Sequence, residues 1–392
     1  MSQTTTTRGD AGPGVAVAGM LLIAATYGMA RFGVGLFAPA LAATRPELVG
    51  VLGWAAAAQF TSYSVAALAA ARMVDRHPRT GLVLAGASAA AGCLGVAAAA
   101  DPAVFVLAVL VGGLGGGFAS PALVPVLDAL VKPEATATAQ SIANAGTAVG
   151  VIGAGLLVFA VPSIGPAWVL MAVICGLSAA AALYPVRARA ALPARPITGT
   201  AQGQSDATGP AADRRALLVP ASAALVIGAG SSLAWTFGPL LVSEAGAVSG
   251  GRVGWLWIAL GAGGLLGTLT GWLVQRIGLR GGWAACAGAL ALATAVVGLS
   301  VATGNAAAAY TGMAVFGAGY MAMSAVLILW ARSAWPRRAA AGTSVLFIAL
   351  ATGQAAGSAA AGAGLDVVDP VLLAAAAAVL CAVGGAAAVI RR

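Results

Sequence analysis

The sequence predicts an all-α polytopic membrane protein with twelve membrane-spanning helices. Of the 392 residues, 60% are hydrophobic and only 8% are charged, whereas a soluble domain carries roughly a quarter charged residues. Apolar stretches of about 20 residues, the length that crosses a bilayer, recur along the whole chain. The alternating ten-residue segments of a membrane barrel do not occur in the sequence, so the spans are expected to be helices.

Six spans are predicted in the first half of the chain. The first follows a short polar start and could be taken for a secretory signal peptide. Its apolar run is longer than such a peptide has and contains Arg31, so we interpret it as a spanning helix. The six spans cover 15–43, 49–73, 80–100, 103–131, 136–161 and 166–186.

A polar stretch then separates the two halves of the chain. Residues 187–215 are rich in Ala, Gly, Pro, Ser, Thr and Arg, a composition typical of a flexible linker. Six further spans follow at 216–243, 251–275, 281–302, 305–333, 338–364 and 370–390. We therefore expect a first six-helix bundle at 1–186, a cytoplasmic linker at 187–215 and a second bundle at 216–392.

Basic residues predict the orientation of the spans. If the N-terminus is cytoplasmic, one side of the membrane carries nearly all Lys and Arg of the connectors, and the other carries only Arg45 and Arg252. This bias places both termini and the linker in the cytoplasm. Because the charges lie in short connectors rather than on one face or tail, nucleic-acid binding is excluded.

The cysteines and the single histidine do not indicate a metal site or a cofactor. Each cysteine lies in a different apolar run without metal-ligand spacing, which predicts small buried hydrophobes and no disulfide framework. His77 lies in a connector, where a proton relay is not expected. The cysteines are Cys93, Cys175, Cys286 and Cys381.

The two halves are similar to each other in sequence. A shift of 200 residues places Phe37 on Phe237 and Pro39 on Pro239, and a shift of 203 places Pro133 on Pro336. Matches of Phe and Pro at a nearly constant offset indicate a duplicated six-helix unit. Such repeats, with a solute site between them near the middle of the membrane, are typical of secondary transporters.

The connector after the second span carries the most specific motif. It reads ARMVDRHPRT at 71–80, and the shift of 200 residues brings it onto GWLVQRIGLR at 271–280. With its two six-span halves, the chain resembles the major facilitator superfamily (MFS) of bacterial permeases, whose loop between helices two and three is roughly G-x-x-x-D-R-x-G-x-R-[RK]. The resemblance covers essentially the whole chain and implies the MFS fold, with two pseudo-symmetric bundles.

In that family this loop holds the two halves together on the cytoplasmic side and releases them during transport. The resemblance therefore implies gating roles for Asp75, Arg76 and Arg79 and, in the second copy, for Gln275 and Arg276. Asp128, near the inner end of the fourth span, could join this gate by pairing with Arg76, or could pair instead with Lys132 one helical turn away. The alternative for all of them is that they only fix the topology.

The family's antiporter motif in the fifth helix, G-x-x-x-G-P-x-x-G-G, is only partly present. The chain has GTAVGVIGAG at 146–155, where Val151 replaces the proline and Ala154 replaces a glycine. The family's fourth-helix arginine is also absent from the corresponding LAVLVGGLGGG. These departures weaken the drug–proton antiporter interpretation, and close helix packing explains glycines four residues apart.

Arg31 is the residue that a membrane helix does not explain. A charge at the bilayer centre costs from ~3 to well over 10 kcal/mol. Arg31 lies about thirteen residues into a core from Ala18 to Leu41, roughly 20 Å from its inner end, which is too deep for its side chain to reach the surface. No carboxylate partner is evident, because the acidic residues lie in loops or near span ends.

We expect Arg31 to face a cavity between the halves and to bind an acidic or polar group of the solute. Hydrogen bonds to backbone carbonyls, or a later start of the span, are the alternatives. The family's first, fourth, seventh and tenth helices line the cavity, which favours Tyr27, Trp235 and Tyr320 as further contacts. Asn144 and Gln354 complete the predicted set, with packing or interhelical hydrogen bonds as the alternative for each.

The sequence thus predicts a secondary active transporter of the bacterial cytoplasmic membrane that moves one small organic solute by alternating access. We expect a monomer without enzymatic activity, with the bilayer and the solute as partners and a proton as a candidate coupling ion. Two alternatives stay open: an efflux exporter of hydrophobic drugs or secondary metabolites, and a non-transporting membrane receptor. An intramembrane enzyme would need a catalytic pair within the spans, and none is visible.

Overall fold

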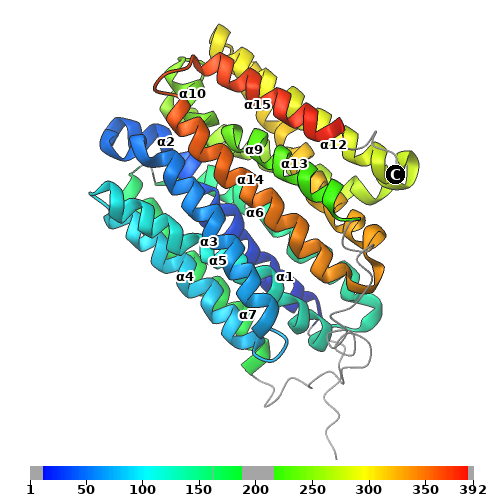
Figure 1. The fold of residues 1–392 in the computed structure, drawn as a ribbon. Coiled ribbons are helices and arrows are strands. Elements are labelled where there is room, and N and C mark those ends of the chain that lie inside the picture. The colour runs from blue at the N-terminus through cyan, green and yellow to red at the C-terminus, as the bar shows by residue number, and fades with distance from the viewer. Residues whose placement is uncertain (1–11, 162, 188–215, 387–392) are drawn as a thin grey trace, which may run out of the picture.

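The computed structural model describes residues 12–161, 163–187 and 216–386. Every regular element in this part of the chain is a helix (Figure 1), and helices cover all twelve predicted spans. The predicted linker, apart from Arg187, lies outside the described residues, as do the two ends of the chain. The all-helical membrane fold is therefore confirmed.

The first half begins with a span that is not one regular helix. It consists of α1 (Gly12–Ile23), the π-helical turn η1 (Ala24–Arg31) and α2 (Gly33–Thr44). Proline, which lacks the backbone N–H that a first helical turn leaves unused, opens α4, α5 and α6. The remaining elements are η2 (Pro46–Val51), α3 (Leu52–Met73), α4 (Pro78–Ala98), α5 (Pro102–Leu130), α6 (Pro133–Ala160) and α7 (Ile164–Arg187).

The second half contains an unexpected junction between its second and third spans. The connector predicted at 276–280 is part of one long helical element, α12, which Gly278 breaks with φ 74° and ψ 169°, a conformation that glycine adopts without steric cost. Thus α12 holds the end of the eighth span and the whole ninth. The elements are α9 (Leu218–Thr236), α10 (Gly238–Glu244), η3 (Gly250–Arg252), α11 (Gly254–Leu265), η4 (Leu266–Leu269), α12 (Thr270–Thr303), α13 (Ala306–Ala334), η5 (Pro336–Arg338), α14 (Ala339–Gly364) and α15 (Pro370–Gly385).

Nine helical stretches among the described residues are long and apolar enough to cross a membrane. One of them, Gly250–Thr303, contains two predicted spans. Helix α3 is not among the nine because Gln59 and the segment TSYS at 61–64 lower its hydropathy. Helix α15 is shorter, with 16 residues. The difference from twelve therefore comes from one merged pair, one polar helix and one short helix.

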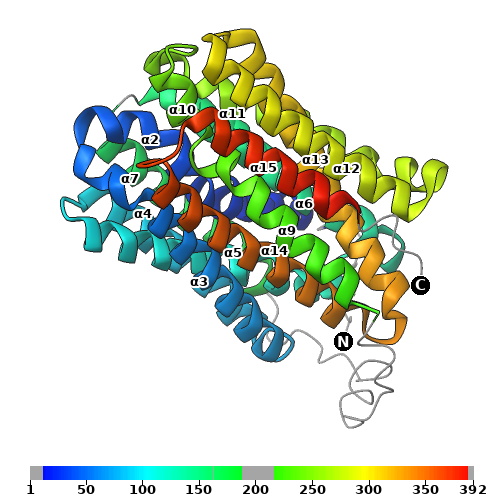
Figure 2. The same cartoon turned by 45° about the horizontal axis from the view of Figure 1, so that its top comes forward.

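The helices pack as two bundles that meet along a central interface (Figures 1 and 2). Within the first half, α4 packs on α5 and α7, α3 on α5, and α1 on α6. Within the second half, α12 packs on α13 and α15, α9 on α14, and α11 on α13. Between the halves, α14 lies beside α3, α11 beside α6, and α10 beside α2.

We call the helix ends near 73–78, 130–133, 276–280 and 334–339 the basic end, and those near 44–52, 98–102, 244–254 and 364–370 the far end. Glycines bring the halves together toward the far end. A Cβ added to Gly155 of α6 would lie 2.5 Å from the carbonyl oxygen of Gly254 in α11, and one added to Gly53 of α3 would lie 2.6 Å from that of Ser358 in α14. The two halves are thus in close backbone contact toward the far end.

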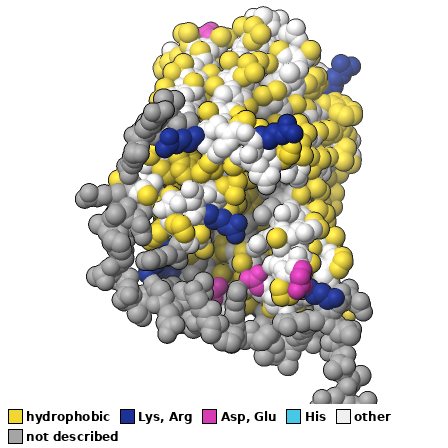
Figure 3. Space-filling view, turned by 90° about the vertical axis from the view of Figure 1, so that its right-hand side faces the viewer, with side chains coloured by type: hydrophobic (Ala, Val, Ile, Leu, Met, Phe, Trp, Pro, Cys, Tyr) yellow, Lys and Arg dark blue, Asp and Glu magenta, His cyan; other side chains and the backbone are white. Residues whose placement is uncertain are grey.

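The face of the molecule shown in Figure 3 is hollowed, with hydrophobic side chains inside the hollow and charged side chains around it.

Candidate functional site

The π-helical turn sets the position of Arg31, which is its last residue. Within the turn, Gly28 packs directly on α6, since an added Cβ would lie 2.5 Å from the Cα of Gly150. The thiol of Cys175 donates to the carbonyl oxygen of Ala25 at 3.6 Å. At Phe32 the backbone leaves the helix (φ −97°, ψ −2°) before α2 begins. π-Helical turns frequently occur at functional sites, and this one presents a cation between the two halves.

Four aromatic rings surround the guanidinium group of Arg31. Its Cζ lies 4.1 Å from the ring centroid of Tyr63, 5.0 Å from that of Phe60, and 5.2 Å from those of Tyr27 and Phe32. The hydroxyl of Tyr27 donates to that of Tyr63 at 2.8 Å. Rings from α3, from η1 and from the junction residue Phe32 therefore build a cage around one positive charge.

The charge of Arg31 is not neutralised by the residues that the structure describes. Arg31 is only 5% exposed, and its Nε is buried without a hydrogen-bond partner among them. The bonds to backbone carbonyls that one alternative requires are not formed there. Cation–π contacts contribute roughly 0.5–2 kcal/mol each, which offsets some of the cost of a charge at this depth, ~3 to over 10 kcal/mol, but such contacts supply no opposite charge. The site is therefore suited to an electron-rich partner.

The second half of the chain supplies the other wall of the site. The ring of Trp235 stacks on that of Phe32 with centroids 3.9 Å apart and an interplanar angle of 12°. Tyr320 packs edge-on against Trp235 at 5.1 Å, and the amide Nε2 of Gln354 donates to the Tyr320 hydroxyl at 3.0 Å. A continuous set of contacts thus runs from Arg31 through Phe32 to polar groups on α9, α13 and α14.

The structure brings together five of the six predicted solute contacts: Arg31, Tyr27, Trp235, Tyr320 and Gln354. The sixth, Asn144, is an exposed residue of α6 with no hydrogen bond to this group in the described part of the chain. Its role stays a prediction.

Sequence reasoning missed three aromatic residues: Phe32, Phe60 and Tyr63. A pattern could have revealed two of them, because Phe60 and Tyr63 are three residues apart and so share one face of a helix. They also lie in the most polar predicted helix. Phe32 gave no such indication, since the break in the helix next to it has no mark in an apolar sequence.

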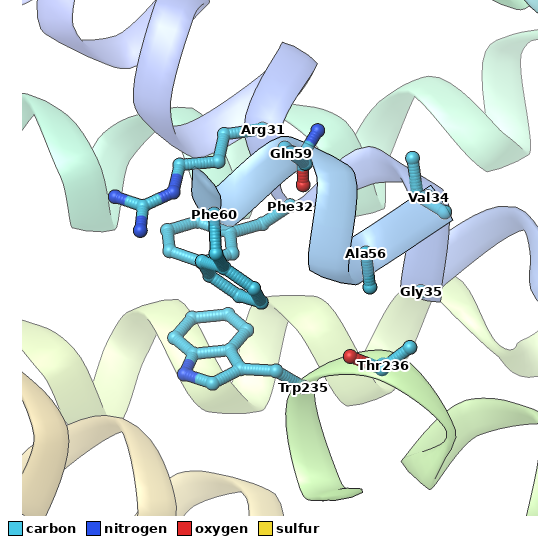
Figure 4. Close-up of a pocket in the computed structure, with 9 residues that line it drawn as sticks. All are labelled: Arg31, Phe32, Val34, Gly35, Ala56, Gln59, Phe60, Trp235 and Thr236. Carbon is cyan, nitrogen blue, oxygen red and sulfur yellow. The ribbon is translucent and has the colours of Figure 1, made fainter. Parts of the chain in front are cut away.

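A small cavity lies on the far-end side of Arg31 (Figure 4). Its volume is about 10 Å³, room for about one water molecule, and Gln59 and Thr236 supply polar atoms to its wall. In Figure 4 the guanidinium group and the indole nitrogen of Trp235 both point away from Gly35 and Thr236. The site is therefore closed toward the far end, while its cationic and N–H groups point the other way.

The predicted gating residues lie at the basic end. Asp75, Arg76 and Gln275 are exposed. Arg79 donates from Nη2 to the carbonyl oxygen of Val186 at 2.7 Å, and Arg276 lies over the ring of Trp272 at 4.4 Å. Asp128 is an exposed residue near the end of α5. Their location agrees with a latch between the halves, but the latch stays a prediction.

The four cysteines are buried and free, as the sequence predicts. Among the described residues, no group of three or more His, Cys, Asp and Glu side chains has a geometry that could hold a metal ion.

Two helical bundles with a polar, aromatic site between them are typical of membrane transporters. The sequence matches the profile of the Major Facilitator Superfamily over residues 20–361, and the chain belongs to this family. No curated protein sequence matches the chain.

Solved transporter structures share the fold. A mutant of the nucleoside transporter NupG is 11% identical, with a TM-score of 0.73 over 96% of this chain and 99% of that one. A POT family transporter in complex with a thioalcohol-conjugated peptide is 11% identical, with a TM-score of 0.74 over 95% and 94%. A structure of a POT family transporter in complex with 5-aminolevulinic acid has the same values. At these identities the likeness extends to the fold alone.

Proposed function

We propose that the chain is a secondary active transporter of the bacterial cytoplasmic membrane that moves a small organic anion by alternating access. The observation that carries this proposal is Arg31, a guanidinium group buried among four ring faces between the two halves. A guanidinium fork matches a carboxylate in shape and charge. The POT family transporter that was solved with 5-aminolevulinic acid shows an acid bound to a protein of this fold.

The orientation follows from the basic connectors. We assign the basic end to the cytoplasm, because Lys and Arg are retained on that side. The far end then faces outward, and the close glycine contacts there correspond to a transporter that is closed to the outside. In this proposal the Asp75 and Arg76 loop closes the basic end in the opposite state, in which the solute site opens outward.

The test is transport by the purified protein in proteoliposomes, with a panel of organic anions, sugars and cationic drugs. We expect saturable uptake of an organic anion, lost in Arg31→Ala and reduced in Arg31→Lys, because lysine keeps the charge but not the planar fork. Lys132→Ala, which removes an exposed cation at the basic end, is the control. Full anion uptake in both Arg31 variants, or a preference for cationic drugs, would overturn the proposal. Saturable binding without flux would indicate a receptor instead.

A further inference from the structure

Two polar groups opposite Arg31 are buried without partners. Gln354 is 0% exposed, and its Oε1 has no hydrogen-bond partner although its Nε2 donates to Tyr320. Trp235 is 2% exposed, and its Nε1 has no partner either. A buried polar group that makes no hydrogen bond destabilises the fold. Such groups are expected where a ligand supplies the missing bond, and here one is an acceptor and the other a donor.

The ring of Phe32 separates the indole of Trp235 from the guanidinium of Arg31, and the ring of Tyr320 lies between this stack and Gln354. The Cζ of Arg31 lies 5.2 Å from the centroid of Phe32, and that centroid lies 3.9 Å from the ring of Trp235 on which it stacks. Figure 4 shows the guanidinium group and the indole nitrogen on the same side of this stack. Tyr320 joins the stack to Gln354. A positive pole and a polar pole are thus joined by a continuous set of aromatic contacts.

We propose that the transported solute is a hydroxyaryl carboxylate, a single aromatic ring with a carboxylate at one end and a hydroxyl at the other. This inference rests on the proposed function and names its substrate class. The carboxylate pairs with Arg31, and the ring packs among Phe32, Trp235 and Tyr320. A phenolic hydroxyl both donates and accepts, so it donates to Gln354 Oε1 while it accepts from Trp235 Nε1. Each of the three unpartnered groups then has a partner.

The present packing indicates what the solute replaces. The cavity beside Arg31 holds about 10 Å³, far less than the several hundred Å³ of a typical ligand site, so a ring enters only if an aromatic side chain moves aside. Phe32 is placed to do so, because it stacks on Trp235 and lies at the junction between the π-helical turn and α2.

The test compares probes that each lack one group. Binding and uptake of 4-hydroxybenzoate, benzoate and 4-hydroxybenzyl alcohol are measured with the full-length protein in proteoliposomes. We expect 4-hydroxybenzoate to bind about 10- to 100-fold more tightly than benzoate, because benzoate leaves the buried polar groups unpaired. We expect 4-hydroxybenzyl alcohol, which lacks the anion, to bind least tightly.

Variants then assign the preference to the two polar groups. Gln354→Met and Trp235→Phe keep most of the side-chain volume but remove the acceptor and the N–H, and each should reduce the preference for 4-hydroxybenzoate over benzoate toward one. Trp168→Phe is the matched control, because Trp168 is another buried indole whose Nε1 has no partner, but it packs against Phe37 rather than Arg31. It should leave the preference unchanged.

The outcomes separate this inference from the proposed function. If the wild type transports an organic anion through Arg31 but does not distinguish 4-hydroxybenzoate from benzoate, the inference is wrong and the proposed function stands. If no organic anion is bound or transported, both are wrong. The comparison of probes on the wild type decides between these outcomes even if a variant fails to fold.

Discussion

Replacing Gly155 by alanine should shift the protein toward a state that is open at the far end. The added Cβ would lie 2.5 Å from the carbonyl oxygen of Gly254, where ordinary contact begins at 3.4 Å. Helices α6 and α11 belong to different halves, so they must separate by about 1 Å or lose this contact. Overpacking of this kind costs about 1–3 kcal/mol.

In the proposed transport cycle the far end opens by separation of α6 and α11, which removes this contact, so the substitution should destabilise only the closed state. A shift of about 1–3 kcal/mol changes the ratio of the two states roughly 5- to 150-fold. Ala56→Cys reports on it, since Ala56 is 4% exposed and lines the small cavity beside Arg31. The four native cysteines are buried, so they give little background with a membrane-impermeant maleimide.

We expect Gly155→Ala to raise maleimide labelling of Ala56→Cys from outside by a factor within this range and to slow solute uptake. Gly150→Ala is the matched control on the same helix, because its Cβ would contact the backbone of Ala24, within the same half. It should lower the melting temperature without increasing labelling. Unchanged labelling and uptake in Gly155→Ala would show that the glycine contact does not take part in closing the far end.

Three other predictions concern the cage, the gate and the orientation. Tyr63→Phe keeps the ring over Arg31 but removes the hydroxyl bonded to Tyr27; it should lower stability by about 1 kcal/mol in thermal unfolding and retain uptake, whereas loss of uptake would make that hydroxyl part of the site. Asp75→Asn removes a charged hydrogen-bond acceptor from the predicted latch, so maximal uptake should fall about tenfold with solute affinity unchanged; unaltered uptake would leave Asp75 as a topology residue. An impermeant maleimide should label Glu47→Cys in intact cells and Glu134→Cys only after permeabilisation, since both positions are exposed at opposite ends; the reverse pattern would invert the proposed orientation.

Hydropathy predicted every span because burial in lipid acts on whole segments of the chain. Hydropathy averaged over a whole segment does not show which of its residues line the site. Helix α3 reads as the least membrane-like of the long helices because Gln59 and the segment 61–64 are polar. Except for the exposed Thr61, these residues are buried between helices, an environment that hydropathy does not describe. The polar helix was thus an unused indication of where the site lies.

The break at Phe32 could not be predicted from local sequence. Its neighbours are Arg31 and Gly33 rather than a proline, and the π-helical turn before it depends on packing against α6 through Gly28 and Gly150. Arg31 is buried between helices, and its aromatic neighbours come from tertiary contacts that its place in the span does not reveal. Asn144 is exposed on α6, since the place of a residue in a span does not fix which way its side chain points.

The π-helical turn also makes the chain sensitive to length at this point. A π-turn accommodates about one residue more than the α-helical turn it replaces, so the first span carries in effect an inserted residue before α2. Deleting Ala30 would restore α-helical register and rotate the two parts of the span against each other by about 100°, which would take the arginine out of its cage of rings. The loss or gain of a single residue in this span can therefore remove a cation from between the two halves or place one there, without any substitution of a side chain.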